Sequence, residues 1–212
     1  MRVVLASASP RRHELLGMIG IAHEVDPADI DESVRSGEAD TAYAMRLATE
    51  KGLAVAARQP DALVIAADTI VVVDGEIFGK PADQADACRM LRVLSGRTHV
   101  VRTAVAVVLD AGRRLECTVE STRVTFRDLD DREIAAYVAT GEPMDKAGAY
   151  GIQGYGATIV ERVDGDYFAV MGLALGLMVR LMAQIGVEYR FGPITESASA
   201  MHNAPATARP SP

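Results

Sequence analysis

The chain has 212 residues, of which 49% are hydrophobic and 24% charged, and its formal net charge is −7. These values are typical of a globular protein with one sizeable core, and no stretch approaches the roughly 18 consecutive apolar residues of a membrane span. The negative charge argues against broad nucleic-acid binding. Cys88 and Cys117 lack metal-type spacing, which favours a reducing compartment. We therefore expect a cytoplasmic protein that binds neither nucleic acids nor membranes.

The first helix is predicted to begin in a setting that suits an anion. An apolar strand at residues 2–6 leads into a loop, after which Ser9 is the expected N-cap and Pro10 the first helical residue. Free N–H groups at such a helix N-terminus attract negative charge. Arg11 and Arg12 occupy the first turn, where the helix dipole disfavours cations. Guanidinium groups match phosphate oxygens, so the arginines indicate a polyphosphate ligand; a solvated basic turn is the alternative.

The next segment combines an acidic loop with a helix. Residues 23–40 are predicted to form a loop whose carboxylates, Glu32 among them, either are solvated or bind a hard divalent cation. A helix capped by Thr41 is expected to run to about residue 58, with Lys51 in the middle of its apolar stripe. That lysine either extends past its neighbours to solvent or reaches into a cleft.

Residues 62–81 are predicted to form a β-hairpin that contains a misplaced acid. Asp68 lies in an otherwise apolar strand, where a carboxylate costs several kcal/mol unless a partner meets it. An Asp-Gly pair at residues 74–75 predicts a type I′ turn. In that register Lys80 lies opposite Thr69 and therefore close to the acid. The alternative to a functional role is a structural ion pair at the end of the hairpin.

The second half of the chain contains a glycine-rich connector between regular elements. Five glycines between residues 141 and 156 surround Gln153, whose amide can read a nucleobase edge; a turn-rich connector is the alternative. The other expected elements are helices at 83–94, 128–140 and 173–185, strands at 99–109, 115–126, 157–163 and 167–171, and a disordered tail at 193–212.

Several charged residues occupy positions that local structure does not explain. Four of them are cations, and the fifth is the acid in the strand: Arg11, Arg12, Lys51, Lys80 and Asp68. Together they describe a site for a metal-bound polyphosphate attacked by water, in which the acid activates the water or helps to hold the metal. The cations would neutralise the phosphates and the departing pyrophosphate.

The sequence resembles the Maf family of nucleoside triphosphate pyrophosphatases over residues 3 to about 185. The resemblance is carried by Ser-Ala-Ser-Pro-Arg-Arg at 7–12, Ala-Asp-Thr at 67–69, Gly-Lys-Pro at 79–81, Leu-Ser-Gly at 94–96 and Asp-Lys-Ala-Gly-Ala-Tyr-Gly-Ile-Gln-Gly at 145–154. It implies an α/β fold of the inosine-triphosphatase-like type, with an elongated mixed β-sheet, flanking helices and a central cleft between two lobes. One domain would span residues 1–192, often as a homodimer.

The resemblance also implies an activity and roles for individual residues. The activity is hydrolysis of a nucleoside triphosphate to the monophosphate and pyrophosphate with a divalent cation (Mg²⁺, Mn²⁺ or Co²⁺). Asp68 matches the proton acceptor, and Glu32 resembles an acid near the metal. Positions lining the phosphate site are Ser7, Ser9, Arg12, Lys51 and Lys80. Positions that separate the subfamilies are Arg11, Thr69 and Gln153, and their identities resemble the branch acting on dTTP, UTP and modified pyrimidine nucleotides.

Two alternatives stay open at this point. One is a nucleotide-binding regulator of cell division without turnover, and the other is a pyrophosphatase of the same fold that is specific for purine nucleotides or 7-methyl-GTP. The chain departs from the family pattern at Gly52, Asp166 and Ala174, none of which belongs to the proposed chemistry.

Overall fold

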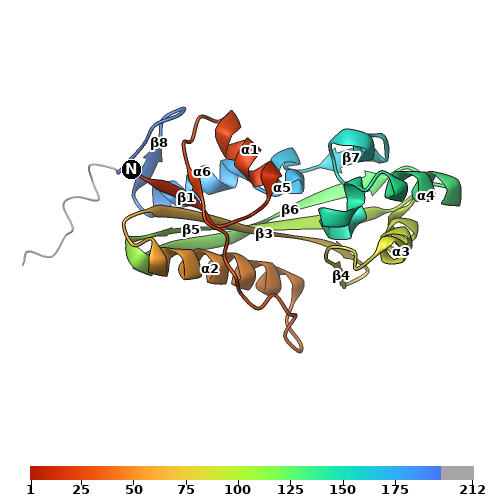
Figure 1. Ribbon diagram of the computed structural model, residues 1–212, viewed down its shortest axis with the longest axis horizontal. Coiled ribbons are helices and arrows are strands. Elements are labelled where there is room, and N and C mark those ends of the chain that lie inside the picture. Colours follow the sequence, from red (N-terminus) through yellow and green to blue (C-terminus); the bar gives the residue numbers. More distant parts are fainter. Residues whose placement is uncertain (197–212) are drawn as a thin grey trace, which may run out of the picture.

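A long seven-stranded mixed sheet runs through the protein, and helices cover both of its faces (Figure 1). The computed structural model describes residues 1–196. The strand order is β2-β1-β3-β5-β6-β7, with β4 paired to part of β3. The strands are β1 (Val3–Leu5), β2 (Glu24–Val25), β3 (Leu63–Val73), β4 (Glu76–Phe78), β5 (Thr98–Leu109), β6 (Arg114–Phe126) and β7 (Val160–Asp164). β1 pairs in parallel with β2 and β3, and the other pairs are antiparallel.

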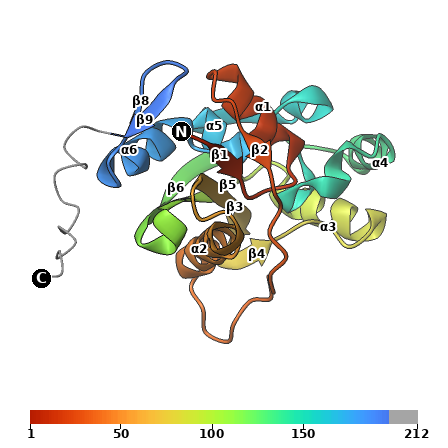
Figure 2. The same cartoon turned by 60° about the vertical axis from the view of Figure 1, so that its left-hand side comes forward.

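Side chains of β3 alternate between two cores. Leu63 and Ile65 pack against α1 (Pro10–Met18), α5 (Tyr167–Met171) and α6 (Leu175–Gln184). Val64 and Ala66 pack on the opposite face against α2 (Asp40–Arg58). This is the alternation expected of a strand buried on both faces. Figure 2 shows α2 on one side of the sheet and α1 and α5 on the other.

A third core lies at the other end of the sheet, where α3 and α4 are found in Figure 1. The second half of β3 and β4 contribute Val71 and Phe78, which pack with residues of α3 (Gln84–Leu94) and α4 (Asp131–Ala139). Between α4 and β7 the chain forms the 3₁₀ turns η2 (Glu142–Asp145), η3 (Ala147–Ala149) and η4 (Gly154–Thr158). The predicted mixed sheet with flanking helices is therefore confirmed.

One edge of β3 is open in the middle of the strand. β1 pairs with residues 63–65, and β4 pairs with residues 71–73 on the same side. Along its other edge β3 is paired with β5 continuously over residues 64–72. Residues 66–70 therefore present a free edge between the two halves of the sheet, and Asp68 and Thr69 lie within it.

The hairpin of β3 and β4 is shorter than predicted. The turn and the pairing of Val73 with Glu76 are confirmed, but the last pair joins Val71 to Phe78. Lys80 therefore does not lie opposite Thr69, which pairs instead with β5 on the other edge. The cause is the glycine-rich segment, because the carbonyl of Gly79 accepts a hydrogen bond from the N–H of Gly148 at 3.0 Å. The chain thus turns away from β3 before the predicted register can continue.

Three other expectations need correction. The predicted strand 167–171 is helix α5, because the Asp166 carboxylate accepts the N–H groups of Phe168 and Ala169. The N-cap of α2 is Ala39 rather than Thr41. β9 (Ile194–Glu196) pairs with β8 (Val187–Tyr189), so the folded domain extends past residue 192 into the predicted tail. Residues 197–212 lie outside the described part of the chain. Among residues 1–196 no helix has the length and apolar character needed to cross a membrane.

Candidate active site

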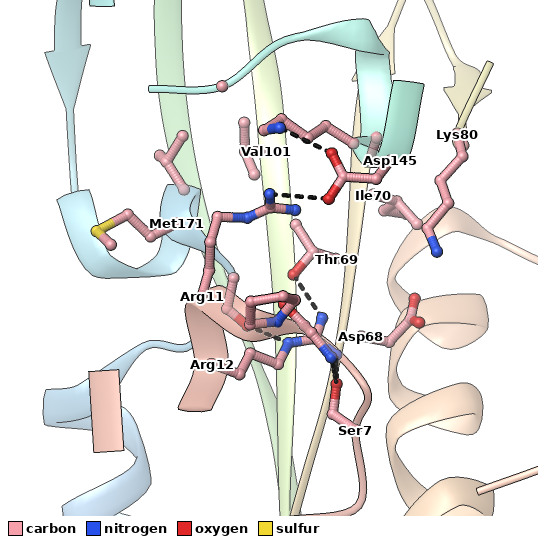
Figure 3. Close-up of a pocket in the computed structure, with 18 of the residues that line it drawn as sticks. Ser7, Arg11, Arg12, Asp68, Thr69, Ile70, Lys80, Val101, Asp145 and Met171 are labelled. Carbon is pink, nitrogen blue, oxygen red and sulfur yellow. Dashed lines mark hydrogen bonds and ion pairs between the residues drawn. The ribbon is translucent and has the colours of Figure 1, made fainter. Parts of the chain in front are cut away.

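A cleft of about 820 Å³ opens at the free edge of β3, a volume in the range of small-molecule sites (Figure 3). Its walls come from the loop between β1 and α1, the middle of α2, β3 and the glycine-rich segment. Every predicted site residue lines it: Ser7, Ser9, Arg11, Arg12, Glu32, Lys51, Asp68, Thr69, Lys80 and Gln153. The predicted central cleft is thus present, and sequence positions far apart meet in it.

The Lys51 ammonium joins two acids on one side of the cleft. Its Nζ lies 2.7 Å from Asp68 Oδ1 and 2.9 Å from Glu32 Oε1. Lys51 and Asp68 are only 9% and 7% exposed, so each compensates the charge of the other. The lysine in the apolar stripe of α2 therefore reaches into the cleft. The ion-pair partner of Asp68 is thus Lys51, whereas the alternative interpretation of the sequence had paired this acid with Lys80.

The second oxygen of Asp68 is available to a ligand. Lys51 occupies Oδ1, whereas Oδ2 accepts no hydrogen bond from residues 1–196. Tyr43 helps to close the cleft beside it by donating its hydroxyl to the carbonyl of Glu32 at 2.8 Å. Burial, followed by the charges of Asp68 and Glu32, raises the pKa of Tyr43. The phenol therefore stays protonated and holds the acidic loop against α2.

Arg12 is a half-buried structural clamp. Its Nε donates to the carbonyl of Gly172 at 2.8 Å. Its remaining contacts run to Ser7 Oγ at 3.0 Å, the carbonyl of Ala67 at 2.7 Å and Thr69 Oγ1 at 3.2 Å. Four of the five guanidinium N–H groups are thus used by the protein. Burial lowers the pKa of Arg12, and the nearby Asp68 charge opposes that shift. The side chain can offer at most one N–H group to a phosphate, so its main effect is to fix Ser7 and Thr69.

The hydroxyl of Thr69 has a defined hydrogen-bond direction. Thr103 Oγ1 donates its single proton to the carbonyl of Ala169 at 2.7 Å. In the 3.0 Å contact between the two hydroxyls, Thr69 must therefore be the donor. Because Thr69 also accepts from Arg12, only an acceptor lone pair is left for a ligand. Sequence reasoning missed Thr103, although its signal is the same as that of Asp68, a polar residue in an apolar strand.

Two further groups of predicted residues border the cleft. Ser9 is the N-cap of α1, as predicted, yet its side chain caps no N–H group and the first turn contains no acid. The start of this helix therefore keeps its attraction for an anion. Lys80 and Gln153 are exposed, and their side chains make no hydrogen bond or ion pair with the described residues. Both are free to contact a ligand.

Arg11 crosses the cleft to the glycine-rich segment, as Figure 3 shows. Its NH1 atom lies 3.2 Å from Asp145 Oδ2, and Lys146 Nζ lies 2.7 Å from Asp145 Oδ1. Burial acts to raise the pKa of Asp145, but Lys146 and Arg11 together bring it below its ordinary value. Asp145 thus fixes the position of Arg11. Asp145 was not among the predicted site residues, although its place within the glycine-rich segment, between Gly141 and Gly148, was a signal.

Glu32 and Asp68 are the residues that could hold a divalent cation. Residues 1–196 contain no cluster of three or more His, Cys, Asp or Glu side chains suited to a metal. Two carboxylates nevertheless fit Mg²⁺, which commonly binds one or two acids and completes its shell with substrate phosphates and water. The accessible Asp68 Oδ2 and the half-exposed Glu32 side chain supply such oxygens. The donor set therefore fits a cation that arrives with a polyphosphate.

Known proteins with similar sequences span nearly the whole chain. The dTTP/UTP pyrophosphatase of Geobacter metallireducens is 53% identical over 87% of this chain and 96% of its own length. The proteins of the same name from Moorella thermoacetica and Koribacter versatilis are 52% and 50% identical, each over 88% of this chain and 96% of its own length. The Ham1 protein of Staphylococcus aureus, a solved structure, is 16% identical with a TM-score of 0.42, covering 87% of this chain and 90% of that one. At that TM-score the likeness adds nothing to the architecture described above.

The family assignment follows from these matches together with a family model. The model described as "Maf-like protein" matches residues 2–185, which include the whole cleft. Identity of about one half over nearly the full length of the relatives supports the same assignment. The chain therefore belongs to the Maf family.

Proposed function

We propose that the protein hydrolyses nucleoside triphosphates, with dTTP and UTP as preferred substrates, to the nucleoside monophosphate and pyrophosphate. The proposal is carried by one observation: a buried carboxylate, Asp68, presents one free oxygen to a cleft bordered by Arg11, Lys51 and Lys80. The relatives of about 50% identity are named for this reaction, and they match this chain along nearly their whole length.

Asp68 acts as the general base in this proposal. Oδ1 is held by Lys51, so Oδ2 has a fixed direction from which to accept a proton from water. The water oxygen attacks the α-phosphorus, the bond from that phosphorus to the bridging oxygen breaks, and pyrophosphate leaves with the bond electrons. Lys80 and the N-terminus of α1 are placed to neutralise the phosphate charge.

A divalent cation (Mg²⁺, Mn²⁺ or Co²⁺) is part of the proposal. Glu32 and Asp68 would hold it, and it would supply charge neutralisation for the phosphate oxygens. Lys51 contacts both acids, so it holds them at the same side of the cleft.

The preference for thymine and uracil is proposed to come from Thr69 and Gln153. Both bases carry an N3–H donor between two carbonyl acceptors, whereas cytosine has an acceptor at N3. Thr69 can only accept a hydrogen bond from a ligand, which suits the N3–H group. The free amide of Gln153 can both donate and accept, which suits a carbonyl edge. Weak turnover of dCTP is therefore expected.

The decisive experiment measures pyrophosphate and orthophosphate release from dTTP, UTP, dCTP, GTP and 7-methyl-GTP with Mg²⁺ or Mn²⁺. Release of pyrophosphate from dTTP and UTP is expected. Orthophosphate alone would exclude the reaction, preference for a purine nucleotide would exclude the base assignment, and tight binding without turnover would favour the regulator.

Asp68→Asn tests the general base. It keeps the shape of the side chain and should lower kcat by about 10²- to 10⁴-fold, the usual contribution of a general base. Asp61→Asn is the matched control, because Asp61 is exposed and lies outside the cleft. Full activity of Asp68→Asn would exclude Asp68 as the base.

Two wider expectations are carried forward as proposals. We propose that the protein is cytoplasmic, and the free thiols of Cys88 and Cys117 support this location because the cytoplasm is reducing. We further propose a homodimer, as expected from the family resemblance. Sedimentation equilibrium of the full chain distinguishes a dimer from a monomer.

A further inference from the structure

The loop that carries Gln153 is built around a single carboxylate. Glu142 Oε2 accepts the N–H of Tyr155 at 2.8 Å, and Oε1 accepts the N–H of Gly156 at 2.9 Å. Oε1 also accepts the hydroxyl of Tyr137 at 2.9 Å, and that hydroxyl accepts the N–H of Gly151 at 3.0 Å. One end of the segment 151–156 is therefore bound to Tyr137 and the other to Glu142, and these two side chains are hydrogen-bonded to each other.

Glycines allow the loop to wrap this closely. A Cβ atom at Gly154 would lie 2.4 Å from Glu142 Oε2. At Gly156 it would lie 2.1 Å from the carbonyl of Gly151 and 2.7 Å from Tyr137 Oη. Real Cβ contacts are longer, so any larger residue at either position would push the loop off the carboxylate. The glycine pattern is thus matched to the side chain that it surrounds.

The chain just before this loop, at residues 142–146, contacts Arg11. Lys146 Nζ donates to the carbonyl of Glu142 and pairs with Asp145, which in turn binds Arg11. Two of the three positions assigned to specificity, Arg11 and Gln153, are therefore positioned by the same stretch of chain, residues 142–156. Gln153 itself makes no side-chain hydrogen bond with the described residues, so the loop backbone sets the point from which its side chain extends into the cleft.

The protonation states suit this arrangement. Burial acts to raise the pKa of Glu142, but the N–H groups of Gly156 and Tyr155 and the hydroxyl of Tyr137 bring it below its ordinary value. Burial raises the pKa of Tyr137. An ionised acceptor therefore faces three donors, and a protonated phenol links it to Gly151.

We propose that Glu142, together with Tyr137, is a positioning residue for base specificity: it holds the loop 151–156 so that Gln153 meets the nucleobase edge. This inference rests on the proposed pyrophosphatase function. Glu142 takes no part in proton transfer, since its oxygens are occupied by the loop. Loss of its contacts should change how well bases are told apart while the phosphate chemistry continues.

Glu142→Gln is the direct test, because it keeps the shape but puts an N–H₂ group against N–H donors. We expect kcat for dTTP to stay within about threefold of the wild-type value. KM for dTTP should rise about tenfold, and the ratio of kcat/KM for dTTP to that for dCTP should fall about tenfold. These are the effects expected from the loss of one charge-assisted hydrogen bond. The matched control is Glu161→Gln. Glu161 is an exposed acid of β7 whose side chain makes no hydrogen bond with residues 1–196.

A double-mutant cycle shows whether Glu142 acts through Gln153. In a Gln153→Ala background, Glu142→Gln should lower the preference no further. An additive loss, or an equal fall of kcat for every nucleotide with unchanged preference, would overturn the inference. If wild-type protein releases no pyrophosphate from any nucleotide, the proposed function fails instead.

A second measurement does not depend on turnover. Amide hydrogen exchange should be about tenfold faster at Tyr155 or at Gly156 in Glu142→Gln, because the glutamine amide keeps one acceptor oxygen and one of the two N–H groups loses its acceptor. Tyr137→Phe removes only one hydroxyl and should speed amide exchange at Gly151. This variant tests the proposal if Glu142→Gln does not fold. Unchanged amide exchange in a folded variant would contradict the proposal that Glu142 and Tyr137 hold the loop 151–156.

Discussion

Replacing Lys51 by Met removes the ammonium shared by Asp68 and Glu32 but keeps most of the apolar stem. Asp68 is only 7% exposed and would be left with an uncompensated charge. Loss of one partner from a buried pair costs about 3–5 kcal/mol. The Glu32 side chain is 57% exposed, so solvent screens its interaction with Lys51 and the lower end of this range of free energies applies. We therefore expect a loss of about 3 kcal/mol, which in a chain of this size lowers Tm by about 6–12 °C.

Thermal and urea unfolding followed by far-UV circular dichroism measures this loss, since the chain has no tryptophan for fluorescence. Lys80→Met is the matched control, because Lys80 is exposed and unpaired among the described residues; its Tm should change by less than about 2 °C. The double variant Lys51→Met/Asp68→Asn removes both charges and should be more stable than Lys51→Met alone. A Tm of Lys51→Met equal to wild type, or a double variant that loses the sum of the single losses, would refute the reasoning.

Three further predictions follow from buried or bridging groups. Arg12→Lys cannot reproduce four directed N–H contacts, so it should lower kcat/KM by at least about tenfold and also lower Tm, measured by pyrophosphate release and circular dichroism. Burial lowers the pKa of His99 from 6.5 to about 4, so the unfolded chain binds the proton first as pH falls. Stability should thus decline by about 3 kcal/mol between pH 6.5 and 4, and His99→Gln should flatten that slope in urea titrations at several pH values. Asp145→Asn weakens the tie to Arg11 and should raise KM for dTTP about threefold with little change in kcat, measured by steady-state kinetics.

The sequence predicted which residues line the cleft better than it predicted which of them contact one another. Charged residues in apolar patterns, such as Lys51 and Asp68, pointed to a shared site because burial of a charge demands a partner. The register that placed Lys80 opposite Thr69 was wrong. The predicted register brought Lys80 to Asp68 by extending local pairing, whereas the structure ends that pairing at Val71 and supplies Lys51 from a helix.

Contacts between remote segments explain the remaining differences. Arg12 was predicted to contact phosphate, and the structure adds a second role: four of its five N–H groups are used by acceptors as distant in sequence as the carbonyl of Gly172. No local pattern reveals such a contact. The helix α5 is a different case, because a five-residue apolar run fits a strand or a helix equally well. The deciding signal was Asp166, whose carboxylate caps the helix and which marks a departure from the family pattern.

The free edge of β3 links the fold to the proposed chemistry. β1 and β4 pair with β3 on either side of residues 66–70, and β5 pairs with β3 along its other edge over residues 64–72. The open stretch 66–70 is therefore anchored by strand pairing although one of its edges lacks a partner strand. Asp68 and Thr69 point to opposite faces of the sheet, as neighbours in a strand must, and the cleft passes around the edge to reach both. A strand paired along both edges would keep these side chains apart. Opening one edge therefore allows a single ligand to contact both Asp68, the proposed general base, and Thr69, the hydroxyl proposed to contact the nucleobase.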